Sequence, residues 1–140
     1  MATYNKFNLF TRDLIQKKHD FANDTFKVLL TNTAPVATNA VKADLTEISA
    51  GNGYTAGGTA TSLTLSNASG VEKVVAANVT FTASGGTIGP FRYAVWYNDT
   101  QTSPADPLIG WADYGSSITL NSTETFTWTP DATNGLFTLT

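Results

Sequence analysis

Paired acidic side chains are the one catalytic option that the residue types and spacings of this 140-residue chain leave open. The candidate pairs are Asp113 with Glu124 and Asp99 with Asp106. Glycoside hydrolysis would need two such carboxyl groups at a fixed separation across the scissile bond. Nothing in the sequence places either pair in that way, and carboxylates on the loops of an acidic protein are usually solvated. We therefore predict no catalytic residue and no enzyme activity.

The sequence contains still fewer residues suited to nucleophilic catalysis or metal binding. The chain has one histidine, His19, and no cysteine, so a Ser-His-Asp or Cys-His arrangement has no support and zinc has almost no ligands. Asn98, Asp99 and Asp106 could offer oxygen ligands to calcium, but their spacing matches no calcium loop. The glycines between 51 and 58 neither follow a convincing strand nor open a helix, as a phosphate-binding loop would. We predict no metal site and no cofactor.

Aromatic side chains could form a binding surface instead. Trp96, Trp111 and Trp128 offer flat faces on which a sugar ring could stack. The alternative is that they fill the core of a small β-sandwich or a subunit interface, and the alternation of side chains around Trp96 favours the core. We keep the three tryptophans as a possible aromatic contact surface.

The elements that would position these residues begin with a helical segment, residues 1–22. Phe7, Phe10 and Leu14 recur near one face of a 3.6-residue repeat. Basic residues follow towards the end of the segment, where they suit the negative end of the helix dipole. We therefore predict a helix over residues 4–19.

From Thr25 onwards the period changes from 3.6 residues to two. Phe26, Val28 and Leu30 alternate with more polar neighbours, as in a strand with one buried face. Residues 36–58 then lack a sustained period, so we predict a long surface loop. Further short strands are predicted at 59–65, 71–76, 78–83, 90–97, 108–114, 117–120, 123–129 and 136–140.

Short strands separated by glycine, proline and asparagine turns are typical of β-sandwiches, jelly rolls and barrels. We predict a mostly β fold, a single-domain jelly roll, β-sandwich or barrel with one N-terminal helix, spanning residues 1–140. The chain contains no cysteine, so disulfides cannot staple it. A chain of this length buries enough surface on folding to need none.

Charge and hydropathy exclude several classes of partner. Charged residues make up only 14% of the chain and the net charge is −3, which leaves no nucleic-acid footprint. No apolar run approaches the length of a membrane span, and the N-terminus lacks the apolar core of a signal peptide. We expect a soluble protein made in the cytoplasm, with neither a nucleic acid nor a membrane as partner.

Five stretches of the chain carry a resemblance to a known group of proteins. Ile-Gly-Pro-Phe-Arg-Tyr-Ala-Val-Trp-Tyr, within 82–99, and Leu-Ile-Gly-Trp-Ala-Asp-Tyr-Gly, within 107–115, resemble small virion proteins of tailed bacteriophages. Residues 4–7, 26–35 and 48–58 are similar to the same proteins, so the resemblance covers most of the chain. It implies a bacteriophage virion structural protein.

Among such proteins, a head decoration or cement protein suits these residues best. Decoration proteins are small, β-rich, cysteine-poor and commonly trimeric, and they clamp neighbouring major capsid subunits. The resemblance thus implies a homotrimer that binds the major capsid protein and is located in the virion. The alternative is a tail-associated structural or receptor- and carbohydrate-binding module, which would expose an aromatic patch and bind glycans.

If the chain is a cement protein, we expect the N-terminal helix and the 36–58 loop to contact the capsid. The helix carries more apolar and basic residues than a free surface helix needs, and the glycines of the loop permit it to order upon a partner. The predicted interface residues are Phe7, Phe10, Arg12, Leu14, Lys17, Lys18 and Tyr54.

Overall fold

The computed structural model describes residues 3–140, which form antiparallel β-strands, one α-helix and one turn of 3-10 helix, η1. In chain order the elements are β1 (Thr3–Lys6), α1 (Phe10–Ile15), β2 (Phe26–Thr31), η1 (Lys42–Asp44), β3 (Thr59–Thr61), β4 (Leu63–Ala68), β5 (Val71–Ala76), β6 (Val79–Thr82), β7 (Ile88–Asn98), β8 (Leu108–Leu120), β9 (Thr125–Trp128) and β10 (Phe137–Leu139). The mostly β fold with a short N-terminal helix is therefore confirmed, and the arrangement is compatible with a β-sandwich.

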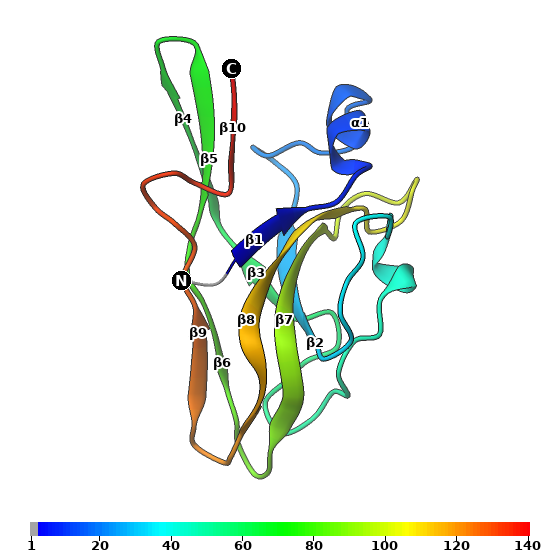
Figure 1. The fold of residues 1–140 in the computed structure, drawn as a ribbon, viewed down its shortest axis with the longest axis vertical. Helices are drawn as coiled ribbons and strands as arrows, with labels where there is room; N and C mark the ends of the chain where they lie inside the picture. The colour runs from blue at the N-terminus through cyan, green and yellow to red at the C-terminus, as the bar shows by residue number, and fades with distance from the viewer. Residues whose placement is uncertain (1–2) are drawn as a thin grey trace.

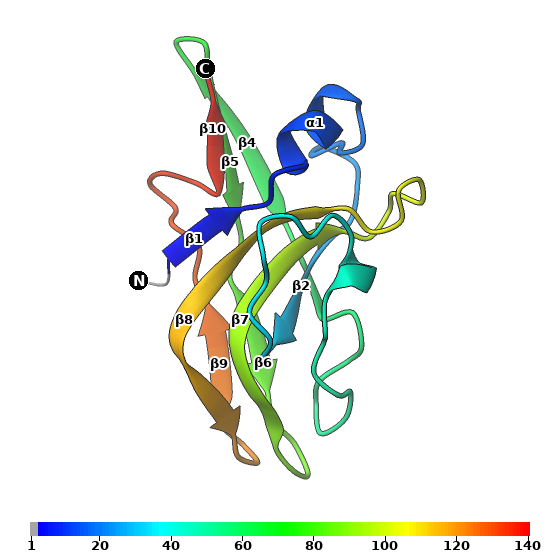
Figure 2. The same cartoon turned by 45° about the vertical axis from the view of Figure 1, so that its right-hand side comes forward.

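The strands form three antiparallel sheets. A five-stranded sheet has the order β1-β8-β7-β2-β3, and β6 pairs with β9 in a two-stranded sheet (Figure 1). A three-stranded sheet, β10-β5-β4, extends beyond the body of the molecule on one side of α1 (Figures 1 and 2). We call this third sheet the flap.

The two longest strands, β7 and β8, form the central hairpin. Ala94 lies opposite Ala112 and Trp96 opposite Gly110. Glycine is required at 110, because a Cβ there would collide with the hydroxyl of Tyr4 on β1. The sequence predicted two strands where β8 runs unbroken, since Gly115, with φ +100°, bends the strand without ending it.

The main core lies between the five-stranded sheet and the β6–β9 pair. Phe26, Val28 and Trp96 from the large sheet pack with Phe81 and Trp128 from the small one. Each is at most 7% exposed. Burying a side chain of this size stabilises the fold by roughly 1.5–3 kcal/mol.

The opposite face of the large sheet has a core of its own. Leu29, Val95 and Tyr97 alternate with the inward-facing residues and are fully buried, together with Phe7. The long loop 36–58 covers this face, where the Tyr97 hydroxyl donates a hydrogen bond to the carbonyl of Gly57 (2.6 Å). The predicted loop thus corresponds to a segment that has a single turn of helix, η1, and closes the second core.

The predicted helix over residues 4–19 is wrong in extent. Residues 3–6 are a strand that pairs with β8, with Tyr4 opposite Ala112. Only six residues, Phe10–Ile15, are α-helical, and Lys17 at φ 59° turns the chain away. The apolar residues do recur at helical spacing, but Phe10 packs into the main core and Phe7 into the core on the opposite face of the large sheet. The two side chains therefore do not lie on one helix face.

The flap is built on the β4–β5 hairpin. Ser69 and Gly70, both with positive φ, form its two-residue turn. At the base of the flap, Phe137 makes edge-on ring contacts with Phe10 and Phe21, at centroid distances of 5.0 and 5.2 Å. The flap is therefore anchored at its base to the segment around α1 and projects from there.

Candidate functional site

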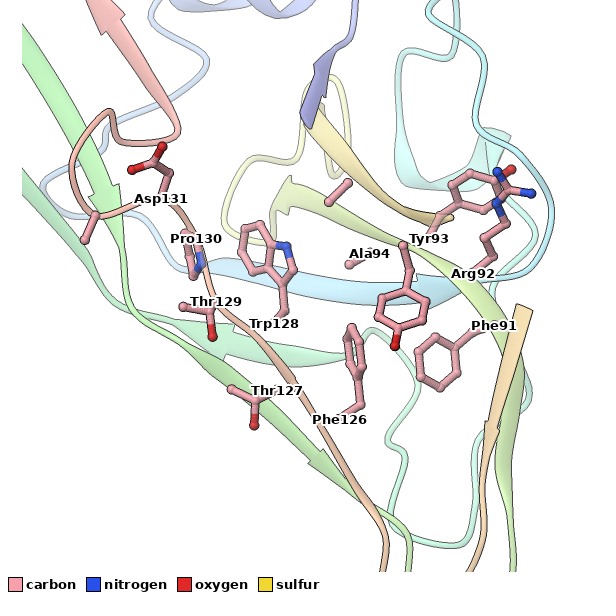
Figure 3. A pocket seen from close by; sticks show the side chains of 13 residues that line it. Phe91, Arg92, Tyr93, Ala94, Phe126, Thr127, Trp128, Thr129, Pro130 and Asp131 are labelled. Atoms are coloured by element: carbon pink, nitrogen blue, oxygen red, sulfur yellow. The ribbon is translucent and has the colours of Figure 1, made fainter. Parts of the chain in front are cut away.

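An aromatic cleft of about 490 Å³ lies between β7, β8 and β9. Figure 3 shows Phe126 and Trp128 of β9 along one side, and Phe91 and Ala94 of β7 along the other. The side chains of Tyr93, Tyr114, Pro130 and Asp131 complete most of its lining. We use the name aromatic cleft for this set of residues.

The cleft exists because β8 and β9 follow one another without pairing. β8 pairs with β7, whereas β9 pairs with β6, so the two strands diverge from the turn that joins them. Phe126 is wedged between them, edge-on to Phe91 (5.1 Å between centroids) and to Tyr114 (5.7 Å). Tyr114 is 51% exposed, so its ring forms an accessible rim.

The charged groups at the cleft, Arg92 and Asp131, both have hydrogen-bond partners within the protein. Arg92 donates two hydrogen bonds to Asp113, from Nε to Oδ1 (2.7 Å) and from a terminal nitrogen to Oδ2 (2.9 Å), and its guanidinium lies over the Tyr93 ring. The hydrogen bond from Arg92 lowers the pKa of Asp113. The backbone N–H of Asn134 likewise lowers the pKa of Asp131. Both carboxylates are held in the ionised form, which suits binding and not proton donation near neutral pH.

Three of the four carboxylates considered from the sequence, Asp113, Glu124 and Asp99, have other partners. Besides Asp113, Glu124 accepts a hydrogen bond from the backbone of Asn121 (2.7 Å), and Asp99 forms an ion pair with Lys27 (2.8 Å). The Asn98 side chain is buried, where it donates to Asp24. Among residues 3–140, no three histidine or acidic side chains are grouped so that they could hold a metal ion.

The three tryptophans do not form one exposed surface, which corrects that prediction. Trp96 is fully buried, and Trp128 is 7% exposed and stands edge-on to it, with ring centroids 4.7 Å apart. Trp111 lies on the opposite face of the sheet, half-buried against Phe7 (4.5 Å). Of the three, only Trp128 borders the aromatic cleft.

The structure divides the predicted interface residues into two groups. Phe7, Phe10 and Tyr54 are buried, so a partner could reach them only by opening the domain, and a contact role for them is wrong. The Tyr54 hydroxyl accepts a hydrogen bond from the amide of Leu30 (3.0 Å) and donates one to Glu47 (2.7 Å).

The remaining predicted interface residues lie nearer the surface. Lys18 is partly covered and donates to the carbonyl of Ser103 (2.7 Å), and Leu14 is also half-buried. Arg12 and Lys17 are exposed. Ile15, which the sequence analysis did not nominate, is 78% exposed and one helical turn from Arg12. We call Arg12, Ile15 and Lys17 the helix patch.

The sequence analysis did not predict Phe126, or its ring contact with Tyr114, as part of a cleft. Their positions depend on the divergence of β8 from β9, and no local pattern encodes that divergence.

No helix in the described part of the chain is long and apolar enough to cross a membrane. No protein-family model matches the chain, and no curated protein or solved structure matches it either.

Proposed function

We propose that this chain is a structural protein of a tailed-bacteriophage virion, located on the head, where it decorates the shell by binding the major capsid protein. The helix patch is the observation that carries the proposal. Ile15 is the most exposed of the large apolar residues in the described chain, and the exposed cationic residues Arg12 and Lys17 lie one helical turn before it and two residues after it. An apolar centre with a charged rim is the anatomy of a protein-binding site.

The resemblance to virion proteins supports the same role. The quoted phrases 82–99 and 107–115 fall on β7 and β8, the hairpin around which both cores are built. The role needs contact area and no nucleophile, so we propose that the chain is not an enzyme. The homotrimer implied by the resemblance stays a prediction.

Binding to capsids that lack the protein tests the proposal. The wild-type chain should saturate defined sites on such capsids, measured by co-sedimentation and by imaging of the particles. Ile15→Asp should reduce occupancy at least tenfold, because it places a carboxylate in the contact. Thr119→Asp, at an exposed position of β8, is the matched control and should bind as the wild type does.

The 36–58 loop offers a competing contact, and Val36, 55% exposed, is its accessible apolar residue. If Val36→Asp abolishes binding while Ile15→Asp does not, the loop is the contact and the helix patch is not. If the wild-type chain binds no capsid, the decoration role is wrong.

The aromatic cleft favours a second candidate function, a tail-associated receptor- or carbohydrate-binding module. The exposed ring of Tyr114 at the rim of the cleft offers a stacking face for a sugar, and the ionised Asp131 in the lining offers a polar partner. A glycan screen tests this function. A hit that Tyr114→Ala abolishes would support it, and a screen without hits would contradict it.

A further inference from the structure

The outer edge of β4 is the longest unpaired strand edge in the described chain that has no protective feature. β4 runs over six residues, Leu63–Ala68, and pairs only with β5. Its residues from Thr64 to Ala68 are all exposed. The other edge strands, β1, β3, β6, β9 and β10, have four residues or fewer.

Natural proteins protect long edges with charges, prolines or bulges, because an open edge pairs readily with another chain. β8 has such protection: the part of it that β1 leaves uncovered is bent at Gly115, whose N–H donates to the Asp113 side chain (2.8 Å). β4 has none. Its sequence, Leu-Thr-Leu-Ser-Asn-Ala, has no charged residue and no proline, and its register with β5 is unbroken.

One face of the flap is also apolar and only partly covered. Opposite residues in an antiparallel sheet point to the same side, so Leu65, Val74 and Phe137 form a row across the three strands. Phe137 is covered by Phe10 and Phe21, but Leu65 at the outer edge remains 43% exposed. Leu139, on the same face, is 46% exposed. The apolar face therefore continues to the open edge and stops there.

We propose that a second copy of this chain pairs with this edge, β4 antiparallel to β4, so that two flaps form one continuous sheet. A strand that pairs with its own copy places like residues close together, and charges would then repel. β4 carries none, so self-pairing meets no such repulsion. Pairing with Leu65 opposite Leu65 of the second copy also joins the two apolar rows and removes both side chains from water.

This contact is independent of the proposed function and of the helix patch. It makes a dimer, in place of the homotrimer that the resemblance implies, and the two assemblies differ in mass. Its recognition chemistry is the backbone edge for affinity and Leu65 for register.

The test is the mass of the full chain in solution, by sedimentation equilibrium over a range of concentrations. We expect a reversible monomer–dimer equilibrium. Ser66→Lys, at an exposed position of β4 next to Leu65, should weaken it at least tenfold, because the two lysines then lie on one face as diagonal neighbours across the twofold axis and repel each other. Ser66→Glu should do the same, and an equimolar mixture of the two variants should regain dimerisation. Thr119→Lys should leave it unchanged.

Amide hydrogen exchange locates the contact. The outward-facing amides of β4 should become protected in proportion to the dimer fraction, while exchange in β8 stays the same. A monomer at all concentrations overturns the proposal. So does a trimer, or a dimer that neither Ser66 variant weakens, since another surface would then hold the copies together.

Discussion

Trp96 and Trp128 stand edge to face with their ring centroids 4.7 Å apart, one on the central strand β7 and the other on β9. The contact joins the five-stranded sheet to the β6–β9 pair directly beside the aromatic cleft. The two indoles hold the sheets together there, so the pair supports the inner end of the cleft.

Replacing Trp128 should therefore destabilise the whole domain. We expect Trp128→Ala to lower the free energy of unfolding by about 3–5 kcal/mol, the usual cost of emptying a buried aromatic site. Chemical denaturation followed by far-UV circular dichroism measures it. Trp111→Ala is the control, and because Trp111 is half-buried on the other face its cost should be clearly smaller. Equal losses for both variants would contradict this account of the core.

The Tyr54 hydroxyl should contribute to stability through the amide that it satisfies. Tyr54→Phe leaves the buried N–H of Leu30 without its acceptor, which costs about 1–3 kcal/mol. Glu47→Gln keeps that bond and weakens only the hydrogen bonds that Glu47 accepts, so we expect a smaller loss. Urea titrations of both variants would show the order, and a larger loss for Glu47→Gln would reverse the assignment.

His19 should make the fold sensitive to mild acid. Burial lowers its pKa to about 4, partly opposed by the charge of Asp24. The unfolded chain, where a histidine has a pKa of about 6.5, then binds more protons than the folded one between these two values. The free energy of unfolding should fall as the pH is lowered from about 6.5 to 4, by on the order of 2–3 kcal/mol.

Comparison with a variant separates the contribution of His19 to the pH dependence of stability from that of the carboxylates. His19 packs against Phe10, Phe21 and Phe26, so His19→Phe keeps an aromatic ring at the site and removes the titration. The pH profile of the variant should be flatter than that of the wild type between pH 6.5 and 4. Asp13, whose pKa is raised by burial, is common to both proteins and cancels in the difference. Parallel profiles would show that His19 does not cause the dependence.

Two glycines with positive φ test how the 36–58 loop is anchored. A Cβ at Gly58 would collide with the carbonyl of Val28, whereas a Cβ at Gly70 would meet no atom within 4 Å. Gly70→Ala should cost only the backbone strain, about 1–2 kcal/mol. Gly58→Ala should cost more and release the start of β3 from β2. Thermal unfolding measures both, and equal shifts in the midpoint would exclude the steric explanation.

Much of the strand pattern could be predicted from the sequence because side chains alternate where one face is buried. Residues 71–76 were predicted with the bounds that β5 has, and 90–97 lies within β7. The prediction of a long N-terminal helix was wrong because the apolar residues that set its period pack into two different cores. Phe7 and Phe10 fall on opposite sides of the large sheet, which only tertiary packing decides.

The candidate surfaces were less predictable for the same reason. The exposure of Ile15 depends on where the helix ends. The aromatic cleft depends on the pairing of β9 with β6 and not with β8. The predicted strand 59–65 covers β3 and only the first half of β4, and the position of β4 at an edge follows from sheet order, which periodicity does not contain.

The turn at Ser69 and Gly70 has one more consequence. It lies at the far end of the hairpin, and both residues are exposed. Loop tips of this kind accept inserted sequence with little effect on folding. A foreign peptide spliced between these two residues would be held away from the domain on a stalk of two strands. The chain would then serve as a display scaffold, and on a repeating shell it would present that peptide as a regular array.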